Sequence, residues 1–355
     1  MARAVLLFSS NTHANYLVAG IPAAVRAGVI VHQREELGSS DVVVIAVPGG
    51  WEASDWAKSE FARLLPQVRV ASGDTNTAGL PEGSPIMDAV SVLAGQPLVL
   101  ANSDAVAHWI DEQDRKKGPG RLLNNIGSDI VRATSKPSDG LVSRYLNRPV
   151  SRFISKIILK FPGVTPFHAT GLAAFTGLLM AACLLFGGAG GLIAGAILFH
   201  AASVIDGVDG EIARATKRSS QFGAKLDTII DAITNLAFLS LASLNLWWQG
   251  QTEAATYGVA GLGLLAFGLT ALGLRSIAMG GPFTFDVVKN NFNARPSRIK
   301  NTLAAITSRD VYAAVFALTF TLGFAEPMLM IFACAAAIWL VTILAVLVTT
   351  RARQS

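Results

Sequence analysis

Short apolar segments alternate with mixed polar segments through the first 130 residues, whereas long apolar segments dominate the chain after residue 160. The early apolar runs are rich in β-branched residues and have the length of strands, and the mixed stretches between them have helical spacing. We therefore predict a soluble α/β domain over residues 1–130. Its candidate strands are Ala4–Phe8, Asp41–Val47, Val68–Ala71 and Pro97–Ala101, and its candidate helices are Ala14–Ala27 and Ser54–Leu65.

The later apolar segments are long enough to cross a membrane, because about 20 helical residues span the hydrocarbon core. They predict an α-helical polytopic membrane domain over residues 164–355, in which an even number of spans returns the C-terminal tail to the side of the N-terminal domain. The six predicted spans are Pro166–Phe186, Gly190–Ala215, Gln221–Trp248, Ala254–Met279, Asp310–Phe324, which is short, and Pro327–Thr349.

A basic linker joins the two parts over residues 131–163. Apolar residues recur there at helical spacing from Ser138 to Leu159, which predicts an amphipathic helix in the membrane interface. Basic residues just before the first span indicate a cytoplasmic location and contact with anionic lipid head groups. The basic residues of this linker and of the 16 residues that precede it are Arg115, Lys116, Lys117, Arg121, Arg132, Lys136, Arg144, Arg148, Arg152, Lys156 and Lys160.

The composition agrees with a membrane protein. Hydrophobic residues make up 52% of the chain, charged residues only 15%, and the mean hydropathy is +0.47. Cys183 and Cys334 both lie inside hydrophobic runs, so neither a disulfide framework nor a cysteine metal site is expected. The apolar start of the chain is too short for a secretory signal, and we expect the N-terminal domain to stay in the cytoplasm.

Four aspartates stand in the otherwise apolar half of the chain. Asp206 and Asp209 are spaced i, i+3, and Asp227 and Asp231 are spaced i, i+4, so each pair lies on one face of its own helix. Residues 217–220 predict a turn, and an antiparallel hairpin would bring the four carboxylates together. One carboxylate inside a membrane costs about 2.5–3.5 kcal/mol. Hard oxygen ligands favour Mg²⁺, Mn²⁺ or Ca²⁺, and we expect a two-metal site of the kind that serves phosphoryl transfer.

Small residues and one cation surround these acids in the sequence. Arg214 supplies a positive charge for a phosphate. An alternative is an acid cluster that lines a proton or ion path in a transporter, which would explain the acids but neither the glycines nor the arginine. The residues that would let a bulky ligand approach the helix backbones are Gly207, Gly210, Ala213, Gly223 and Ala224.

The complete pattern resembles the signature of the CDP-alcohol phosphotransferase, or phosphatidyltransferase, family. It is Asp206-x2-Asp209-Gly210-x2-Ala213-Arg214-x8-Gly223-x3-Asp227-x3-Asp231. The resemblance implies an enzyme in which an acceptor hydroxyl displaces CMP, and a homodimer packed through its spans. It also implies two divalent cations, Mg²⁺ or Mn²⁺, held by Asp206, Asp209, Asp227 and Asp231, of which Asp231 is also the base.

The same resemblance implies the residues that bind the donor. Asp206, Gly210, Ala213, Arg214 and Gly223 would hold the cytidine diphosphate. Thr165-Pro166-Phe167-His168-Ala169-Thr170 is similar to the family's Thr-Pro-Asn-x-x-Thr at the start of the first span, which adds Thr165 to this set. Phe167 replaces the asparagine, so any polar contact that the asparagine makes is not expected here.

Two stretches resemble the family branch that acts on inositol phosphates. They contain Lys136, Arg144 and Arg148 before the signature, and Thr307-Ser308-Arg309-Asp310 after it. The resemblance implies that Lys136, Arg144, Arg148 and Arg309 bind an acceptor phosphate. The alternatives are plain membrane-surface charge for the first cluster and a helix-capping role for Asp310.

The N-terminal domain resembles the nucleotidyltransferase-like domain of the enzymes that fuse inositol-phosphate cytidylyltransferase to di-myo-inositol phosphate phosphate synthase. Gly20-Ile21-Pro22 followed by Arg26 is similar to the first helix of that family. However, residues 9–14, Ser-Ser-Asn-Thr-His-Ala, stand where such transferases need a glycine-rich basic loop for phosphates. We therefore expect a degenerate, non-catalytic module that aids folding, oligomerisation or regulation.

The predicted function is a membrane transferase with a CDP-inositol-like donor and a hydroxyl acceptor. One alternative is a CDP-diacylglycerol-dependent phospholipid synthase that uses inositol phosphate or glycerol phosphate. An alternative of another class is a cation transporter with an intramembrane acid cluster. We expect the protein in a prokaryotic cell membrane, with the active-site opening on the cytoplasmic side, lipid as a partner and no nucleic acid.

Overall fold

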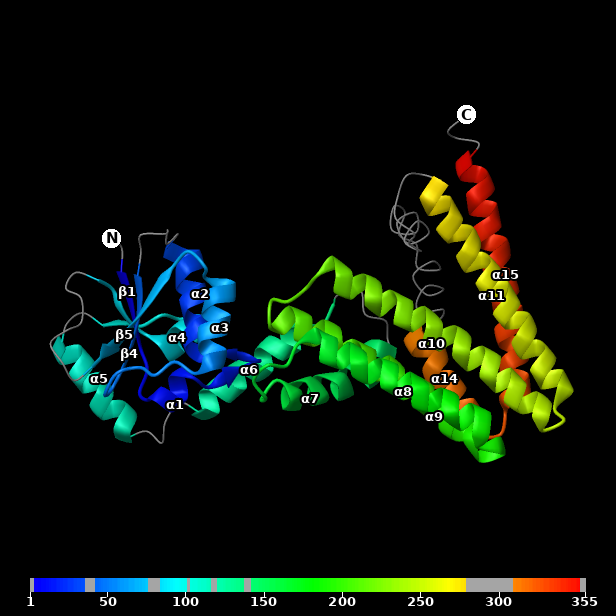
Figure 1. Cartoon of the computed structure of the whole chain (residues 1–355), viewed down its shortest axis with the longest axis horizontal. Helices are drawn as coiled ribbons and strands as arrows, with labels where there is room; N and C mark the ends of the chain where they lie inside the picture. The colour runs from blue at the N-terminus through cyan, green and yellow to red at the C-terminus, as the bar shows by residue number, and fades with distance from the viewer. Residues whose placement is uncertain are drawn as a thin grey trace. The chain divides into compact units, whose positions relative to one another are not determined.

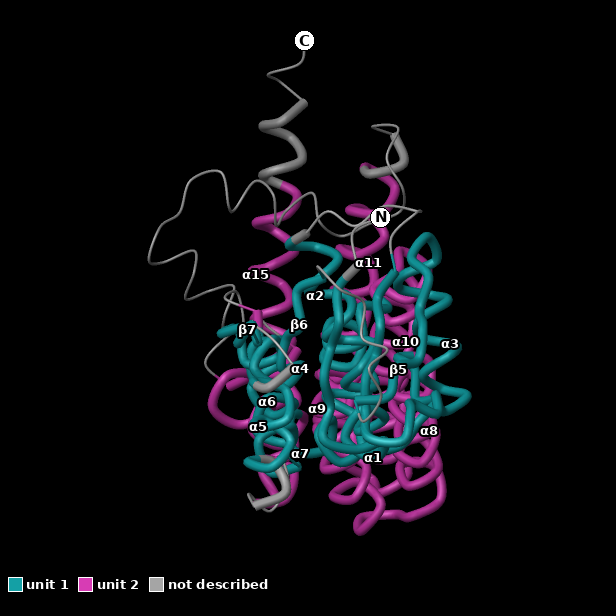
Figure 2. The backbone as a smooth tube through the Cα atoms, turned by 90° about the vertical axis from the view of Figure 1, so that its left-hand side faces the viewer, with its two compact units in different colours: residues 1–135, 152–166, 210–218 teal, residues 136–151, 167–209, 219–355 magenta. Residues whose placement is uncertain are grey.

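The computed structural model describes residues 3–35, 42–75, 84–100, 103–115, 120–136, 142–278 and 309–351. Strands occur near the N-terminus, and long helices follow residue 165 (Figure 1). The chain groups into two compact units, which Figure 2 colours separately. Unit 1 comprises residues 1–135, 152–166 and 210–218, and unit 2 comprises residues 136–151, 167–209 and 219–355.

Unit 1 is built on a five-stranded sheet in the order β5-β4-β1-β6-β7, in which β7 alone is antiparallel to its neighbour. Arg3 of β1 pairs with Val42 of β4, and the parallel register continues to Leu7 and Ala46. Five of the six residues of β4 are buried, as expected for a parallel strand covered on both faces. The strands are β1 (Arg3–Leu7), β4 (Val42–Val47), β5 (Arg69–Asp74), β6 (Ile86–Asp88) and β7 (Val99–Leu100).

Helices cover both faces of this sheet. Alternate residues of β1 point to opposite faces, so Leu6 packs with the core beneath α2 and α3, while Leu7 packs with Trp109 of α5. Ser54 caps α3, because its hydroxyl accepts a hydrogen bond from the amide of Ala57 at 3.1 Å. The helices are α1 (Asn11–Ala14), α2 (Ala23–Glu35), α3 (Asp55–Leu64), α4 (Ala89–Leu93), α5 (Ser103–Arg115) and α6 (Gly120–Ala133).

The predicted α/β character of this region is confirmed, but the predicted helix Ala14–Ala27 is wrong at its centre. Strands β2 (Leu17–Val18) and β3 (Ile21–Pro22) form an antiparallel hairpin there. Its turn places Ala19 and Gly20 at φ 47° and 82°. Ala19 has a side chain that disfavours this backbone conformation, so the local sequence gives no sign of the turn. Strand β6 was also missing from the predicted strands.

Five helices are long and apolar enough to cross a membrane: α8 (Pro166–Phe186), α9 (Gly188–Ala215), α10 (Gln221–Trp248), α11 (Thr252–Ala278) and α15 (Ala325–Arg351). The fifth predicted span corresponds to α14 (Arg309–Thr321), whose 13 residues cover only about 20 Å of a core about 30 Å thick. A sixth span is therefore not confirmed within the described residues.

Aromatic stacking and close helix contacts hold unit 2 together. The rings of Phe199 and Phe238 stack with centroids 4.1 Å apart, and Phe316 meets Phe238 edge-on at 5.2 Å. The Asn245 amide donates hydrogen bonds to the carbonyls of Leu184 and Gly188, at 2.6 and 3.1 Å, where α8 turns into α9. The bond to Leu184 satisfies a carbonyl that the C-terminal end of α8 leaves without an intrahelical partner, and the bond to Gly188 ties α10 to the first residue of α9.

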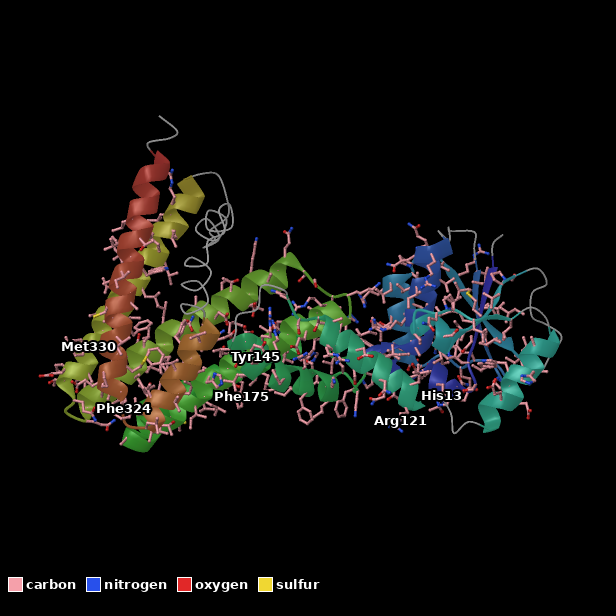
Figure 3. The ribbon with its side chains drawn as sticks, turned by 180° about the vertical axis from the view of Figure 1, so that it is seen from behind. His13, Arg121, Tyr145, Phe175, Phe324 and Met330 are labelled. Atoms are coloured by element: carbon pink, nitrogen blue, oxygen red, sulfur yellow. The ribbon has the colours of Figure 1, made fainter. Side chains whose placement is uncertain are left out.

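The outer surfaces of these helices are apolar. Figure 3 labels Phe175 on α8 and Met330 on α15, which are 55% and 42% exposed, and Phe324 in the connection just before α15, which is 57% exposed. Large contiguous apolar surfaces are unusual on a soluble monomer and are what a lipid environment accepts. Together with the five long apolar helices, they make the chain an integral membrane protein.

A π-helical turn, η1 (Ser143–Asn147), leads into α7 (Arg148–Ile158). Tyr145, Phe153 and Ile157 expose apolar side chains at helical spacing, whereas Ser151 and Ser155 on the other side are buried. This two-sided pattern is the one expected of an interfacial helix, and the interfacial location stays a prediction. Residues 138–141, with which the predicted helix begins, lie outside the described residues.

Candidate active site

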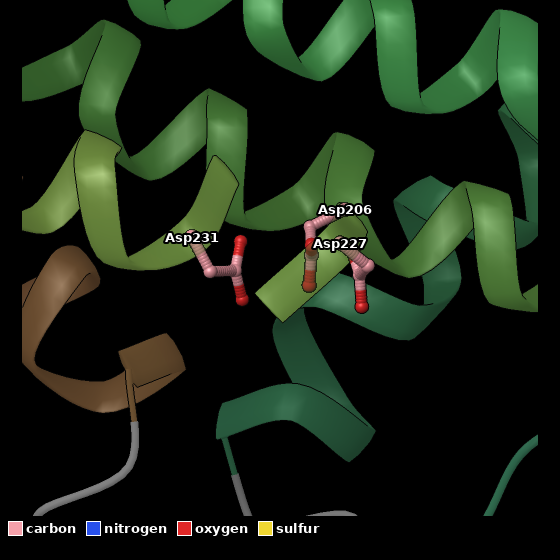
Figure 4. A group of neighbouring side chains, drawn as sticks. All are labelled: Asp206, Asp227 and Asp231. Carbon is pink, nitrogen blue, oxygen red and sulfur yellow. The ribbon is translucent and has the colours of Figure 1, made fainter. Parts of the chain in front are cut away.

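Three aspartates converge between two helices of unit 2. Asp206 lies on α9, and Asp227 and Asp231 lie on α10, one helical turn apart. Each can offer a carboxylate oxygen to a common point, and these oxygens all lie within 4.8 Å of one another (Figure 4). The hairpin of α9 and α10 therefore juxtaposes acids from both sequence pairs, as their placement about the turn predicted.

Asp209, the fourth predicted ligand, is held by a neighbouring helix. The hydroxyl of Thr170 on α8 donates a hydrogen bond of 3.0 Å to Asp209 Oδ2. Thr170 is 7% exposed, so this hydroxyl is removed from bulk water. The bond fixes one carboxylate oxygen of Asp209 against α8.

Arg309, at the start of α14, brings a positive charge to the acid cluster. Its guanidinium forms an ion pair with Asp231 and lies 3.6 Å from Asp206 Oδ1. The Arg309 side chain is 14% exposed, which strengthens its interaction with the carboxylates because solvent screens it little. One positive charge against three carboxylates leaves an excess of negative charge that suits a divalent cation.

Asp310 follows Arg309 and is held by hydrogen bonds from two other segments. Its Oδ1 accepts one from Asn147 Nδ2 at 3.0 Å and one from Ser203 Oγ at 2.7 Å. Asn147 and Ser203 are only 4% and 3% exposed. The start of α14, and with it the position of Arg309, is thus fixed against the π-helical turn and α9.

Residues 164–348 match the family model described as CDP-alcohol phosphatidyltransferase. The chain belongs to the CDP-alcohol phosphatidyltransferase family. This match covers slightly more than half of the chain and includes α9, α10 and α14, so the acid cluster described above lies inside the family domain. The family predicted from the aspartate signature is therefore confirmed.

Two curated proteins that share one name are also similar to this chain. A protein of Aquifex aeolicus named bifunctional IPC transferase and DIPP synthase is 41% identical over 109 residues, which are 30% of this chain and 24% of the relative. A protein of Thermococcus kodakarensis with the same name is 34% identical over 156 residues, which are 44% and 32% of the two chains. The matched segments therefore cover between about a quarter and a third of these relatives.

The predicted donor residues of this CDP-alcohol phosphatidyltransferase family member lie around the α9–α10 turn and before α8. A Cβ atom at Gly210 would lie 3.0 Å from the Arg214 guanidinium, so the glycine gives this side chain room. Arg214 Nε donates a hydrogen bond of 2.7 Å to the Thr134 carbonyl. The Gly223 amide donates to the Ser220 hydroxyl that caps α10, at 3.0 Å. Ala213 and Arg214 lie in the last turn of α9, and Thr165 precedes α8.

The predicted acceptor-phosphate residues differ in their placement. Arg148 is 8% exposed, and its Nη1 donates to the Gly207 carbonyl on α9 at 3.3 Å. A Cβ atom at Gly207 would lie 3.1 Å from that nitrogen. Arg144 and Lys136 are exposed. Arg309 and Arg148 therefore both contact groups near the aspartates within unit 2, whereas Lys136 and Arg144 present their charge at the surface.

Three site neighbours were not singled out by the sequence. Thr170 ends the Thr-Pro-x-x-x-Thr start of α8, and a hydroxyl in a mostly apolar helix was an available signal. Ser203 stands three residues before Asp206 and so on the same face of α9. Asn147 had no such local signal, because its partner Asp310 lies 163 residues away.

The loop after β1 is occupied by its own hydrogen bonds. Ser10 caps α1 by accepting from the His13 amide at 3.2 Å, and the hydroxyls of Ser9 and Ser10 both contact His13 Nδ1. Partial burial lowers the pKa of His13, which favours its neutral form. This loop therefore builds a helix start, and it contains neither the glycines nor the lysine of a phosphate-binding loop.

Proposed function

We propose that this protein is a Mg²⁺-dependent membrane transferase that moves a phosphoalcohol from a CDP-alcohol to an acceptor hydroxyl and releases CMP. The observation that carries the proposal is the convergence of Asp206, Asp227 and Asp231 within 4.8 Å. In the reaction the acceptor oxygen bonds to the phosphorus that carries the alcohol, and the bond from that phosphorus to the CMP oxygen breaks. The hydroxyl proton leaves to a base, and CMP takes the electron pair of the broken bond.

The residues present fit a divalent metal site. Carboxylate oxygens are the ligands that Mg²⁺ and Mn²⁺ prefer, and here they come from two helices joined by a short turn. Asp206, Asp209, Asp227 and Asp231 would hold two such ions. When bound, the ions would neutralise the phosphates and stabilise the charge on the attacking and leaving oxygens.

The protein's own side chains then have separate tasks. Asp231 accepts the proton of the acceptor hydroxyl, as the last aspartate of the signature. Arg309 binds the acceptor phosphate, for which its guanidinium is suited because it presents parallel donors on a rigid plane. Arg148 supports the acceptor together with Lys136 and Arg144. The donor diphosphate is held by Asp206, Gly210, Ala213, Arg214, Gly223 and Thr165.

We infer that the donor is CDP-inositol-like. The similarity to proteins named bifunctional IPC transferase and DIPP synthase supports this choice, as do the stretches around Arg148 and Arg309 that resemble the inositol-phosphate branch. The second candidate donor is CDP-diacylglycerol. It is favoured by the exposed apolar side of α10 beside the acids, where Phe222, Ile229 and Ile233 are 72%, 55% and 61% exposed and a lipid tail would be accommodated.

The test is CMP release by the purified, detergent-solubilised protein with Mg²⁺. CDP-inositol and CDP-diacylglycerol are compared as donors, each with inositol phosphate, glycerol phosphate or no acceptor. We expect turnover with CDP-inositol that Asp231→Asn abolishes while metal binding is largely retained. Turnover with CDP-diacylglycerol alone would replace the donor assignment. No CMP from either donor, combined with cation flux in proteoliposomes, would favour the transporter alternative.

We also propose the orientation and the assembly. Cytoplasmic exposure of the N-terminal region and of the opening of the site follows from the basic residues before α8, in a prokaryotic cell membrane. The homodimer that the family resemblance implies would bury part of the apolar surface of the spans. Labelling of single cysteines from each side of sealed vesicles tests the orientation, and cross-linking in the membrane tests the dimer.

A further inference from the structure

A fully buried carboxylate lies in unit 1, away from the acid cluster in the sequence. Glu60, on α3, has 0% exposure. Its oxygens accept hydrogen bonds from Arg63 at 3.2 and 2.6 Å, and it also forms an ion pair with Arg218, which follows α9. A buried carboxylate is tolerated only when it is paired and hydrogen-bonded. Glu60 therefore binds these two guanidinium groups together.

Arg63, one of the two arginines paired with Glu60, also contacts the C-terminal end of α9. Arg63 donates hydrogen bonds to the carbonyls of Thr216 and Lys217 at 2.8 and 3.1 Å. Arg26 on α2 donates to the Ala215 carbonyl at 2.9 Å. Carbonyls at a helix C-terminus lack intrahelical partners and carry the negative end of the helix dipole. Two arginines of the α/β fold thus cap α9.

Burial does not remove the charge of this cap. It lowers the pKa of Arg26 to about 10, and the attraction of Glu60 acts in the opposite direction. Arg26 also donates to the carbonyls of Val18 and Ala19 in the β2–β3 hairpin, at 3.0 and 3.2 Å. The hairpin that replaced the centre of the predicted helix is therefore part of the cap.

The turn between α9 and α10 contains a residue in the left-handed backbone region, which disfavours residues with a side chain. Lys217 lies at φ 54°, and the Arg218 amide bonds to the Ala213 carbonyl at 2.8 Å, which is the pattern of a helix end that usually requires glycine. The Trp56 ring lies beneath Arg218, with the guanidinium carbon 5.1 Å from the ring centre. A left-handed residue with a side chain persists because these contacts hold the turn.

This turn joins the two helices that carry the aspartates. Asp209 precedes the end of α9 by less than two helical turns, and Asp227 follows the start of α10 by less than two. We propose that Glu60 is a positioning residue for the reaction: through Arg63 and Arg218 it clamps the α9–α10 turn and so sets the register of the two aspartate pairs. The proposal rests on the proposed function and gives the α/β fold a task that needs no catalysis of its own.

The test compares Glu60→Gln with Asp55→Asn in the full-length protein. Asp55 lies on the same helix and pairs with Lys58, but both side chains are exposed, so this pair contacts solvent instead of the turn. Mn²⁺ binding is measured by calorimetry, and CMP release gives kcat and the donor KM. We expect Glu60→Gln to weaken Mn²⁺ binding by about 10-fold and to lower kcat by about 10-fold, as replacement of residues that orient metal ligands does. The donor KM should stay within about twofold of the wild-type value. Asp55→Asn should match the wild type.

Unchanged Mn²⁺ affinity and kcat in a folded Glu60→Gln protein would overturn the proposal. If Glu60→Gln does not fold, Arg218→Lys is measured instead, because it keeps the carboxylate paired but removes the planar fork that reaches it. Weaker Mn²⁺ binding in that variant supports the clamp, and wild-type binding overturns it. The Mn²⁺ measurement needs no substrate, so failure of the wild type to release CMP would reject the proposed function separately.

Discussion

The guanidinium of Arg309 forms an ion pair with the carboxylate of Asp231, across 78 residues of sequence. The same group lies 3.6 Å from Asp206. A side chain that the sequence assigned to the acceptor phosphate is thus the counter-ion of the proposed base. A divalent cation bound at these carboxylates would compete with Arg309 for them, and an incoming phosphate would attract Arg309 towards itself.

Replacement of Arg309 should therefore change the metal affinity and the kcat/KM for the acceptor in opposite directions. In Arg309→Gln we expect tighter Mn²⁺ binding, because a competing charge is lost, and a loss of about 100-fold in kcat/KM for the acceptor, because a charge-assisted contact with phosphate is lost. Calorimetry and CMP release measure the two effects. Lys160→Gln removes an exposed base instead and should change neither. Weaker metal binding in Arg309→Gln would contradict the competition.

The hydrogen bond from Thr170 to Asp209 should support metal binding. Thr170→Val keeps the shape of the side chain and removes the donor, and we expect Mg²⁺ affinity to fall by about 10-fold. Thr176→Val is the matched control on the same helix, because its hydroxyl donates to the Leu172 carbonyl at 2.9 Å and has no hydrogen bond to a carboxylate of the described residues. The concentration of Mg²⁺ that gives half-maximal CMP release is the measurement. Equal effects of the two substitutions would show that only helix packing was altered.

The bond from Ser203 to Asp310 should stabilise the start of α14. Ser203→Ala removes a buried hydrogen bond to a carboxylate, and we expect the free energy of unfolding to fall by about 1.5–3 kcal/mol. Ser243→Ala should cost less, because its buried hydroxyl donates to the neutral Leu239 carbonyl of its own helix. Thermal unfolding in detergent compares the two. A loss in Ser203→Ala no larger than in Ser243→Ala would contradict the assigned role.

Metal should stabilise the protein by relieving repulsion among the acids. A ligand at 100 times its dissociation constant adds about 2.7 kcal/mol, so Mg²⁺ should raise the Tm and chelation should lower it. Asp227→Asn should unfold at a higher temperature than the wild type in chelator, because one repelling charge is gone, and should lose most of the response to Mg²⁺. Glu253→Gln changes an exposed acid and should retain that response. A full Mg²⁺ response in Asp227→Asn would argue against a metal at these carboxylates.

The left-handed backbone at Lys217 should make glycine favourable there. Lys217→Gly removes a steric cost of about 1–2 kcal/mol, partly offset by the greater freedom of glycine in the unfolded chain. We expect a Tm higher by a few degrees. Lys217→Ala keeps the Cβ atom and should give no gain, so a similar rise in both variants would assign the effect to the lost charge instead.

The sequence by itself determined the chemistry and the local geometry of the acids. The i, i+3 and i, i+4 spacings place each pair of aspartates on one helix face whatever surrounds it. The polar residues 217–220 interrupt the apolar pattern between the two pairs and so predict a turn. The long apolar segments and the α/β alternation were equally legible, because both depend on periodicity within a few residues. The predicted domain boundaries and site roles stay predictions.

Only the tertiary structure decided which groups support those acids. Thr170 reaches Asp209 across 39 residues, Arg309 reaches Asp231 across 78, and Arg218 reaches Glu60 across 158. The β2–β3 hairpin and the backbone of Lys217 likewise depend on distant partners, since the local sequence disfavours φ above zero at alanine and lysine. Contacts of this kind leave no periodic trace in the chain, because they are set by how helices and strands pack and not by the spacing of residues within them.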